Sequence, residues 1–73
     1  MSYSKIVYVM ERPETDEIIH IHEGYAHNTT SYDIYEHGEL AEYALGAPYT
    51  PKQFVEIMAK EGFRLGGYRL REE

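Results

Sequence analysis

The hydrophobic positions near the start of the chain fall into two short stretches separated by a polar turn. Residues 4–12 (SKIVYVMER) and 18–26 (IIHIHEGYA) are rich in β-branched and aromatic residues, which favour strands. Between them, residues 13–16 (PETD) are typical of a turn. The pattern therefore predicts a β-hairpin.

Charge and apolar pairing together favour one register for this hairpin. If paired residue numbers sum to 28, four complementary pairs form: Val7–Ile21, Val9–Ile19, Lys5–Glu23 and Arg12–Asp16. Successive strand residues point to opposite faces, so the four aliphatic residues of these pairs form a face for the core. The second face is then apolar, aromatic and histidine-bearing, and it carries Ile6, Tyr8, Met10, Ile18, His20 and His22.

A hydrophobic stripe with helical spacing follows near the end of the chain, formed by Phe54, Ile57 and Met58. Thr50 is placed as an N-cap, Pro51 fits the first helical position, and Gln53 completes a capping box. Gly62 is placed to end the helix in the left-handed conformation. The pattern predicts a helix over residues 51–61.

The middle of the chain allows two interpretations. Residues 32–36 (YDIYE) are typical of a strand, and a turn at residues 37–38 would lead into a second strand at residues 39–45 (ELAEYAL). Glu, Leu and Ala also favour helices, so the same residues 39–45 are compatible with a helix. We favour the hairpin, although it creates two like-charge pairs, Asp33–Glu42 and Glu36–Glu39.

The remaining apolar stretch, residues 63–70 (FRLGGYRL), predicts a last strand, in which Gly66-Gly67 forms a bulge or a tight turn. Together the elements predict an α+β fold. We expect one small domain over residues 1–73, with an antiparallel sheet of four to five strands and one helix packed on its aliphatic face. The 73 residues include no cysteine, which excludes a disulfide framework and a thiolate zinc site.

The charge of the chain argues against direct contact with nucleic acid or membrane. Thirteen acids against seven Lys and Arg give a net charge of −6, which repels phosphates and anionic lipid surfaces. Acids also recur every three residues in the middle of the chain, at Asp33, Glu36, Glu39 and Glu42. This acidic surface is either a solvated face or an imitation of a phosphate backbone. A small basic patch is expected near the end, from Arg64, Arg69 and Arg71.

Residues that would carry chemistry are few. The chain has no cysteine, no serine in a nucleophile elbow and no phosphate-binding loop, so we expect neither an enzyme nor a cofactor. His20 and His22 are two apart on a strand and point the same way, which suits a metal ion if a third ligand joins them. His27, His37 or Glu36 would supply it, but no position is fixed for any of them. We therefore assign no metal ligand and keep a metal-binding protein as a third hypothesis.

The leading hypothesis is a non-enzymatic protein–protein interaction module. Its contact surface would be the second hairpin face described above, because contiguous exposed apolar surface marks contact sites. Eight tyrosines support recognition, since Tyr combines a large apolar body with a polar tip. The partner would be another protein or a second copy in a homodimer. The alternative is an acidic inhibitor that occupies a nucleic-acid-binding groove. No signal peptide or membrane segment is visible, so we expect a cytoplasmic protein.

Overall fold

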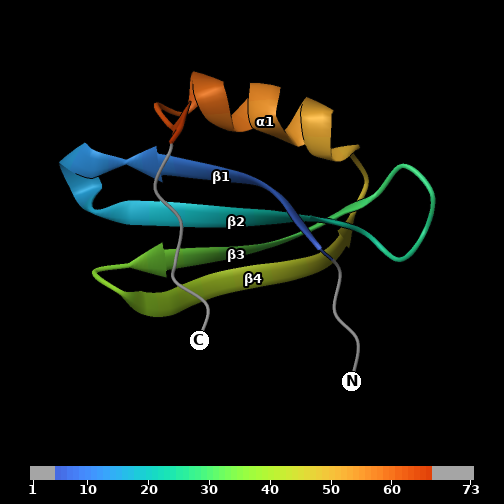
Figure 1. Cartoon of the computed structure of the whole chain (residues 1–73), viewed down its shortest axis with the longest axis horizontal. Coiled ribbons are helices and arrows are strands. Elements are labelled where there is room, and N and C mark those ends of the chain that lie inside the picture. Colours follow the sequence, from blue (N-terminus) through green and yellow to red (C-terminus); the bar gives the residue numbers. More distant parts are fainter. Residues whose placement is uncertain (1–4, 67–73) are drawn as a thin grey trace.

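The computed structural model describes residues 5–66, which form one sheet and one α-helix. The strands are β1 (Ile6–Arg12), β2 (Glu17–Glu23), β3 (Thr30–Glu36), β4 (Glu39–Ala47) and β5 (Arg64–Leu65). The 3-10 turn η1 (Pro13–Thr15) joins β1 to β2, and α1 (Pro51–Lys60) lies between β4 and β5. All strand pairs are antiparallel, in the order β4-β3-β2-β1-β5, and α1 packs against one face of the sheet and runs along β1 (Figure 1). The expected small single-domain α+β fold is confirmed.

The helix forms where its local signals predict. The Thr50 hydroxyl accepts a hydrogen bond from the Gln53 N–H (3.1 Å), and the Gln53 side chain accepts one from the Thr50 N–H (3.0 Å). At the other end, Gly62 has a φ of 101°, in the left-handed region. The N–H groups of Gly62 and Phe63 bond back to the carbonyls of Ala59 and Met58, which is a Schellman motif.

The middle of the chain is a hairpin, so the helical interpretation of residues 39–45 is wrong. His37 and Gly38 both have positive φ, 51° and 84°, as a two-residue type I′ turn requires. The expected pairing of Glu36 with Glu39 is confirmed. The pairing of Asp33 with Glu42 is wrong, because a register shift between Ile34 and Tyr35 places Asp33 opposite Tyr43 and Ile34 opposite Glu42.

The register expected for the first hairpin is also wrong over most of its length. Ile6 pairs with His22 as expected, but a shift follows between Ile6 and Tyr8, and the later pairs are one residue out. Arg12 now pairs with Glu17, and their side chains form an ion pair at 2.5 Å. Asp16, the expected partner of Arg12, instead ends the turn in the left-handed conformation. The turn therefore takes four residues, and this length sets the register.

The shift exchanges residues between the two faces of the sheet. Met10 now lies opposite Ile19 and is 1% exposed, and Tyr8 lies opposite Ile21 and packs against the same core. Val9 was expected on the helix side, but it lies on the opposite face of the sheet and pairs with His20. The buried core therefore consists of Met10, Ile19, Ile21, Phe54 and Phe63.

Arg12 connects the sheet to the end of the helix. Its guanidinium bonds Glu17, donates to the Glu61 carbonyl at the C-cap of α1, and lies 4.3 Å above the centre of the Phe63 ring. Hydrogen bonds from the Thr15 and Arg12 side chains hold the pKa of Glu17 below its usual value. One side chain thus fixes the turn, the strand end and the helix end together.

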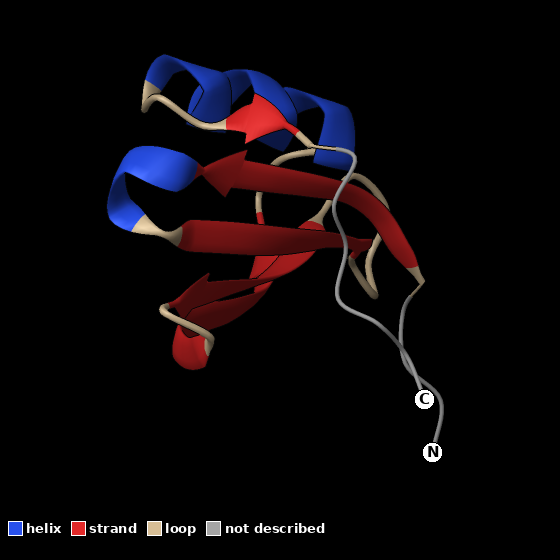
Figure 2. Cartoon of the chain, turned by 60° about the vertical axis from the view of Figure 1, so that its left-hand side comes forward, coloured by secondary structure: helices blue, strands red, loops and turns tan. Residues whose placement is uncertain are grey.

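The helix covers only part of the sheet (Figure 2). Its main contacts are with β1, β2 and β5, and the Phe54 ring stacks on Tyr32 of β3 with centroids 4.6 Å apart. Beyond this stack, β4 forms one edge of the sheet. No helix in residues 5–66 is long and apolar enough to cross a membrane.

The position of Met10 makes the register testable by mutation. Met10→Ala empties a buried site, so we expect it to lower the free energy of unfolding by about 2–5 kcal/mol. Leu40→Ala is the matched control, because Leu40 is also a strand residue but is exposed, and its effect is expected within about 0.5 kcal/mol. Urea unfolding of the two variants measures the difference. Equal effects would contradict this register.

Candidate functional site

The sheet face opposite α1, here called the outer face, is the surface that the first hairpin was expected to supply. Four residues of the expected contact set lie on it by register, namely Ile6, Ile18, His20 and His22. The other two, Tyr8 and Met10, pack on the helix side, so the expected set does not form one surface. The register adds residues that were not anticipated there: Val9, Ser31, Asp33, Tyr35, Leu40, Tyr43 and Leu45.

His20 is the central residue of the outer face and is 5% exposed. Its ring lies 5.2 Å from the Tyr35 ring, and its neighbours across the strands are Val9 and Asp33. Burial lowers the pKa of His20, although the charge of Asp33 acts in the opposite direction. Within residues 5–66 its Nε2 has no hydrogen-bond partner, and neither has Ser31 Oγ. A buried imidazole with a lowered pKa therefore lies in the middle of this face.

The residues considered as metal ligands do not gather around the two histidines. His22 Nε2 lies 3.2 Å from Asp33 Oδ2. His37 is at the far end of the sheet, where its Nδ1 lies 3.0 Å from Asp16 Oδ2. Glu36 is on the helix side and His27 is in the loop after β2. In the described part of the chain, no three His, Cys, Asp or Glu side chains are grouped to hold a metal ion.

The most exposed apolar part of the outer face lies on β4. Leu40, Tyr43 and Leu45 are 53%, 63% and 66% exposed, and we call them the β4 apolar row. Leu40 and Tyr43 are three residues apart, which would place them on opposite faces of a regular strand. The register shift in β4 inserts one extra residue between them, so that both face outward. No pattern in the sequence indicates this bulge.

The four regularly spaced acids do not share one face. Asp33 is on the outer face, whereas Glu36, Glu39 and Glu42 lie on the helix side, with Glu36 directly opposite Glu39. Burial raises the pKa of Tyr32, and the negative charge of Glu42 raises it further. Within residues 5–66, no Lys or Arg forms an ion pair with these four acids.

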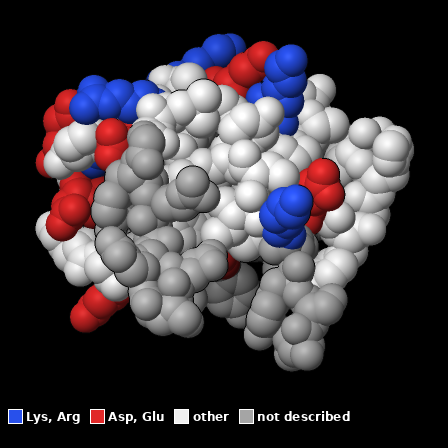
Figure 3. Space-filling model, viewed as in Figure 1, with Lys and Arg blue, Asp and Glu red and all other residues white. Residues whose placement is uncertain are grey.

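Charge is instead divided between the two halves of the sheet. Between residues 13 and 51 the sequence has eight acids and no Lys or Arg, so β2, β3 and β4 carry neither of these two residues. The Lys and Arg side chains of the described residues are on β1, α1 and β5 or just before β1, and several of them lie along the helix in Figure 3. Arg64 of the expected basic patch is exposed on β5, 3.9 Å from Glu11. Arg69 and Arg71 lie outside the described residues, as does the second half of the strand expected over residues 63–70.

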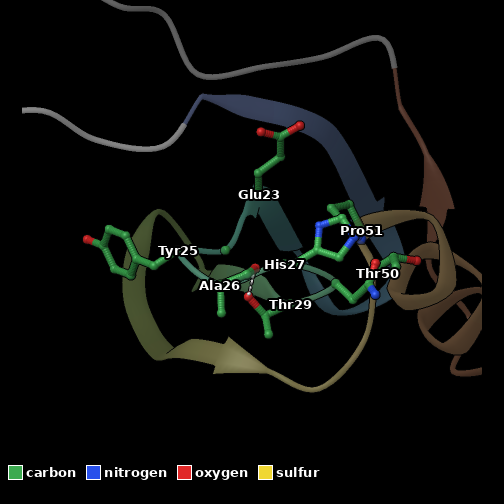
Figure 4. A pocket seen from close by; sticks show the side chains of 9 residues that line it. Glu23, Tyr25, Ala26, His27, Thr29, Thr50 and Pro51 are labelled. Carbon is green, nitrogen blue, oxygen red and sulfur yellow. Dashed lines mark hydrogen bonds between the residues drawn. The ribbon is translucent and has the colours of Figure 1, made fainter.

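A pocket of about 430 Å³ lies between the loop after β2 and the start of α1 (Figure 4). Two of its polar side chains are engaged in local structure: Thr29 donates to the Ala26 carbonyl (2.7 Å), and Thr50 caps the helix. The Glu23 carboxylate points away from the other side chains, and the His27 ring lies beside Pro51 (Figure 4). The pocket therefore presents no paired acid and base.

Comparisons of the chain with known proteins found no relative. No family model, curated protein or solved structure matches the chain. The described residues present an exposed apolar edge strand, β4, and a buried histidine, His20, two strands away on β2.

The buried histidine predicts a pH dependence of stability. Because the folded pKa of His20 is lowered, the unfolded chain takes up a proton below about pH 6.5 more readily than the folded one. We expect the free energy of unfolding to fall between pH 7.5 and 5.5, with a contribution from this group of at most about 1.4 kcal/mol per pH unit. Urea titrations across this range should show a flatter profile for His20→Gln. His27→Gln, in an exposed loop, is the control and should keep the wild-type profile. An unchanged slope in His20→Gln would contradict this assignment.

Proposed function

We propose that this chain is a non-enzymatic protein–protein interaction module that binds its partner through the outer side of β4. The observation that carries the proposal is the exposure of the β4 apolar row on an edge strand. Large apolar side chains that remain exposed and contiguous in a small domain are typical of contact sites.

The size of the row is sufficient for a specific but modest contact. Burying a large apolar side chain completely contributes about 1.5–3 kcal/mol. Leu40, Tyr43 and Leu45 have over half of their surface still exposed, so a partner would gain roughly 1–2 kcal/mol from each of them. Tyr43, near the middle of the strand, has the amphipathic character of binding hot spots. The proposed contact surface is therefore the outer side of β4, beside Tyr35 on β3, in place of the first hairpin.

The alternative, an acidic inhibitor that imitates nucleic acid, has one observation in its favour. The eight acids between residues 13 and 51 have no Lys or Arg among them in the sequence. Against it, Asp33 faces away from Glu36, Glu39 and Glu42, so the four acids do not form the single line of charge that a phosphate backbone presents. We therefore place the interaction module first.

Site-specific photo-crosslinking tests the proposal. A benzophenone side chain at position 43 is expected to give a discrete cross-linked species, either with a second copy or with another protein in a lysate of the source organism. Adding Leu45→Ser should reduce its yield at least tenfold, because the neighbouring apolar contact is lost. The matched control carries the benzophenone at Tyr25, which is 78% exposed in the loop after β2 and lies off the apolar row. Equal cross-linking from both positions would overturn the proposal.

A further inference from the structure

The free edge of β4 offers main-chain groups as well as side chains. β4 pairs with β3 on one side, and within residues 5–66 no strand pairs with its other side. An open edge carries unpaired N–H and C=O groups that can receive another strand, which is the recognition mode called β-augmentation. Which strand it receives depends on the side chains that flank these groups.

Those side chains differ between the two faces of β4. On the helix side are Glu39 and Glu42, and on the outer side is the β4 apolar row. A strand added to the edge also alternates its side chains between the two faces. Its residues on the helix side would therefore meet carboxylates, and its residues on the outer side would meet Leu40, Tyr43 and Leu45.

The carboxylates on the helix side are not neutralised within the described chain. Glu39 faces Glu36 across the strands, an arrangement that is destabilising by about 0.2–1 kcal/mol. No Lys or Arg lies anywhere between residues 13 and 51 to compensate it. A base brought in by a partner strand would relieve this repulsion, which a neutral or acidic strand would not.

The same charges oppose a second copy at this edge. Pairing β4 with β4 of another molecule would bring together two acidic sheet halves that contain no Lys or Arg. Charged residues on an edge strand prevent such edge-to-edge pairing. The carboxylates thus oppose self-association at this edge and at the same time favour a positively charged partner.

We infer that β4 binds an extended segment of another protein in which Lys or Arg alternates with apolar residues. The segment adds as a new edge strand, its bases reach Glu39 and Glu42, and its apolar residues cover Leu40, Tyr43 and Leu45. This inference rests on the proposed function and specifies its partner.

The test uses the full chain, labelled with ¹⁵N, and two synthetic peptides. The probe is acetyl-(Lys-Val)₄-amide, and the control is acetyl-Lys₄-Val₄-amide, which has the same composition and charge without the alternation. We expect the probe to shift the amide resonances of residues 39–47 saturably and to bind at least tenfold more tightly than the control. Because the bases contact carboxylates, 0.5 M NaCl should weaken binding at least fivefold.

Two double variants separate local from general electrostatics. The double variant Glu39→Gln/Glu42→Gln is expected to weaken binding of the probe peptide at least tenfold. The control variant Glu14→Gln/Glu56→Gln removes the same charge from exposed positions outside β4. It should weaken binding of the probe peptide less than threefold. Equal binding of both peptides, equal loss in both variants, or resonance shifts confined to other residues would overturn the inference.

Light scattering at low and high protein concentration distinguishes the failure of this inference from the failure of the proposed function. A monomer at both concentrations is expected. A dimer that Tyr43→Ser/Leu45→Ser dissociates would overturn the basic partner segment but would leave β4 as the contact surface. Absence of probe binding, together with no cross-link from position 43, would overturn both.

Discussion

One short helix has to cover a sheet of five strands, and much of the molecule follows from this constraint. The helix runs along β1 rather than across the strands (Figure 1), so its width of about 10–12 Å limits its coverage, whereas five strands at their usual spacing span about 19 Å. Placed over β1 and β2, α1 buries Met10, Ile19 and Ile21 beneath Phe54 and Phe63. Toward β3, the aromatic contact that α1 makes is the stacking of Phe54 on Tyr32. The core is therefore small and displaced to one side, and β4 remains at the exposed margin.

Elements defined by neighbouring residues could be predicted from the sequence, whereas strand register could not. The capping box at Thr50 and the left-handed Gly62 depend on contacts a few residues away, so the bounds of α1 were predictable. The register of β1 against β2 depends on how Met10 packs under a helix over forty residues later, and on closure of the Arg12–Glu17 pair. A register chosen by counting complementary pairs takes account of neither the packing of Met10 nor the closure of this ion pair. An error of one residue in the register then moves every later side chain to the other face.

The kinds of side chain in the candidate site could be predicted from the sequence, but most of its residues could not. A sheet face bearing apolar, tyrosine and histidine side chains was expected, and Ile18, His20 and His22 do lie on it. The β4 apolar row was missed because Leu40 and Tyr43 have the spacing of a helix face, and a bulge converts that spacing into one face of a strand. The exposure of these side chains depends in addition on how much of the sheet α1 covers. No local sequence pattern predicts the position of α1 on the sheet.

The order of the strands in the sheet has a consequence for how the chain reaches this structure. From β1 to β4 every strand pairs with its neighbour in sequence, and only β5 returns across the chain to pair with β1. Such local pairing costs little loop-closure entropy, and topologies of this kind fold faster than those built from distant pairings. The hairpins can close one after another during synthesis, leaving β5 and the anchoring of the helix end for last. The edges of β2 and β3 are then unpaired only briefly, which limits misassembly of the nascent chain.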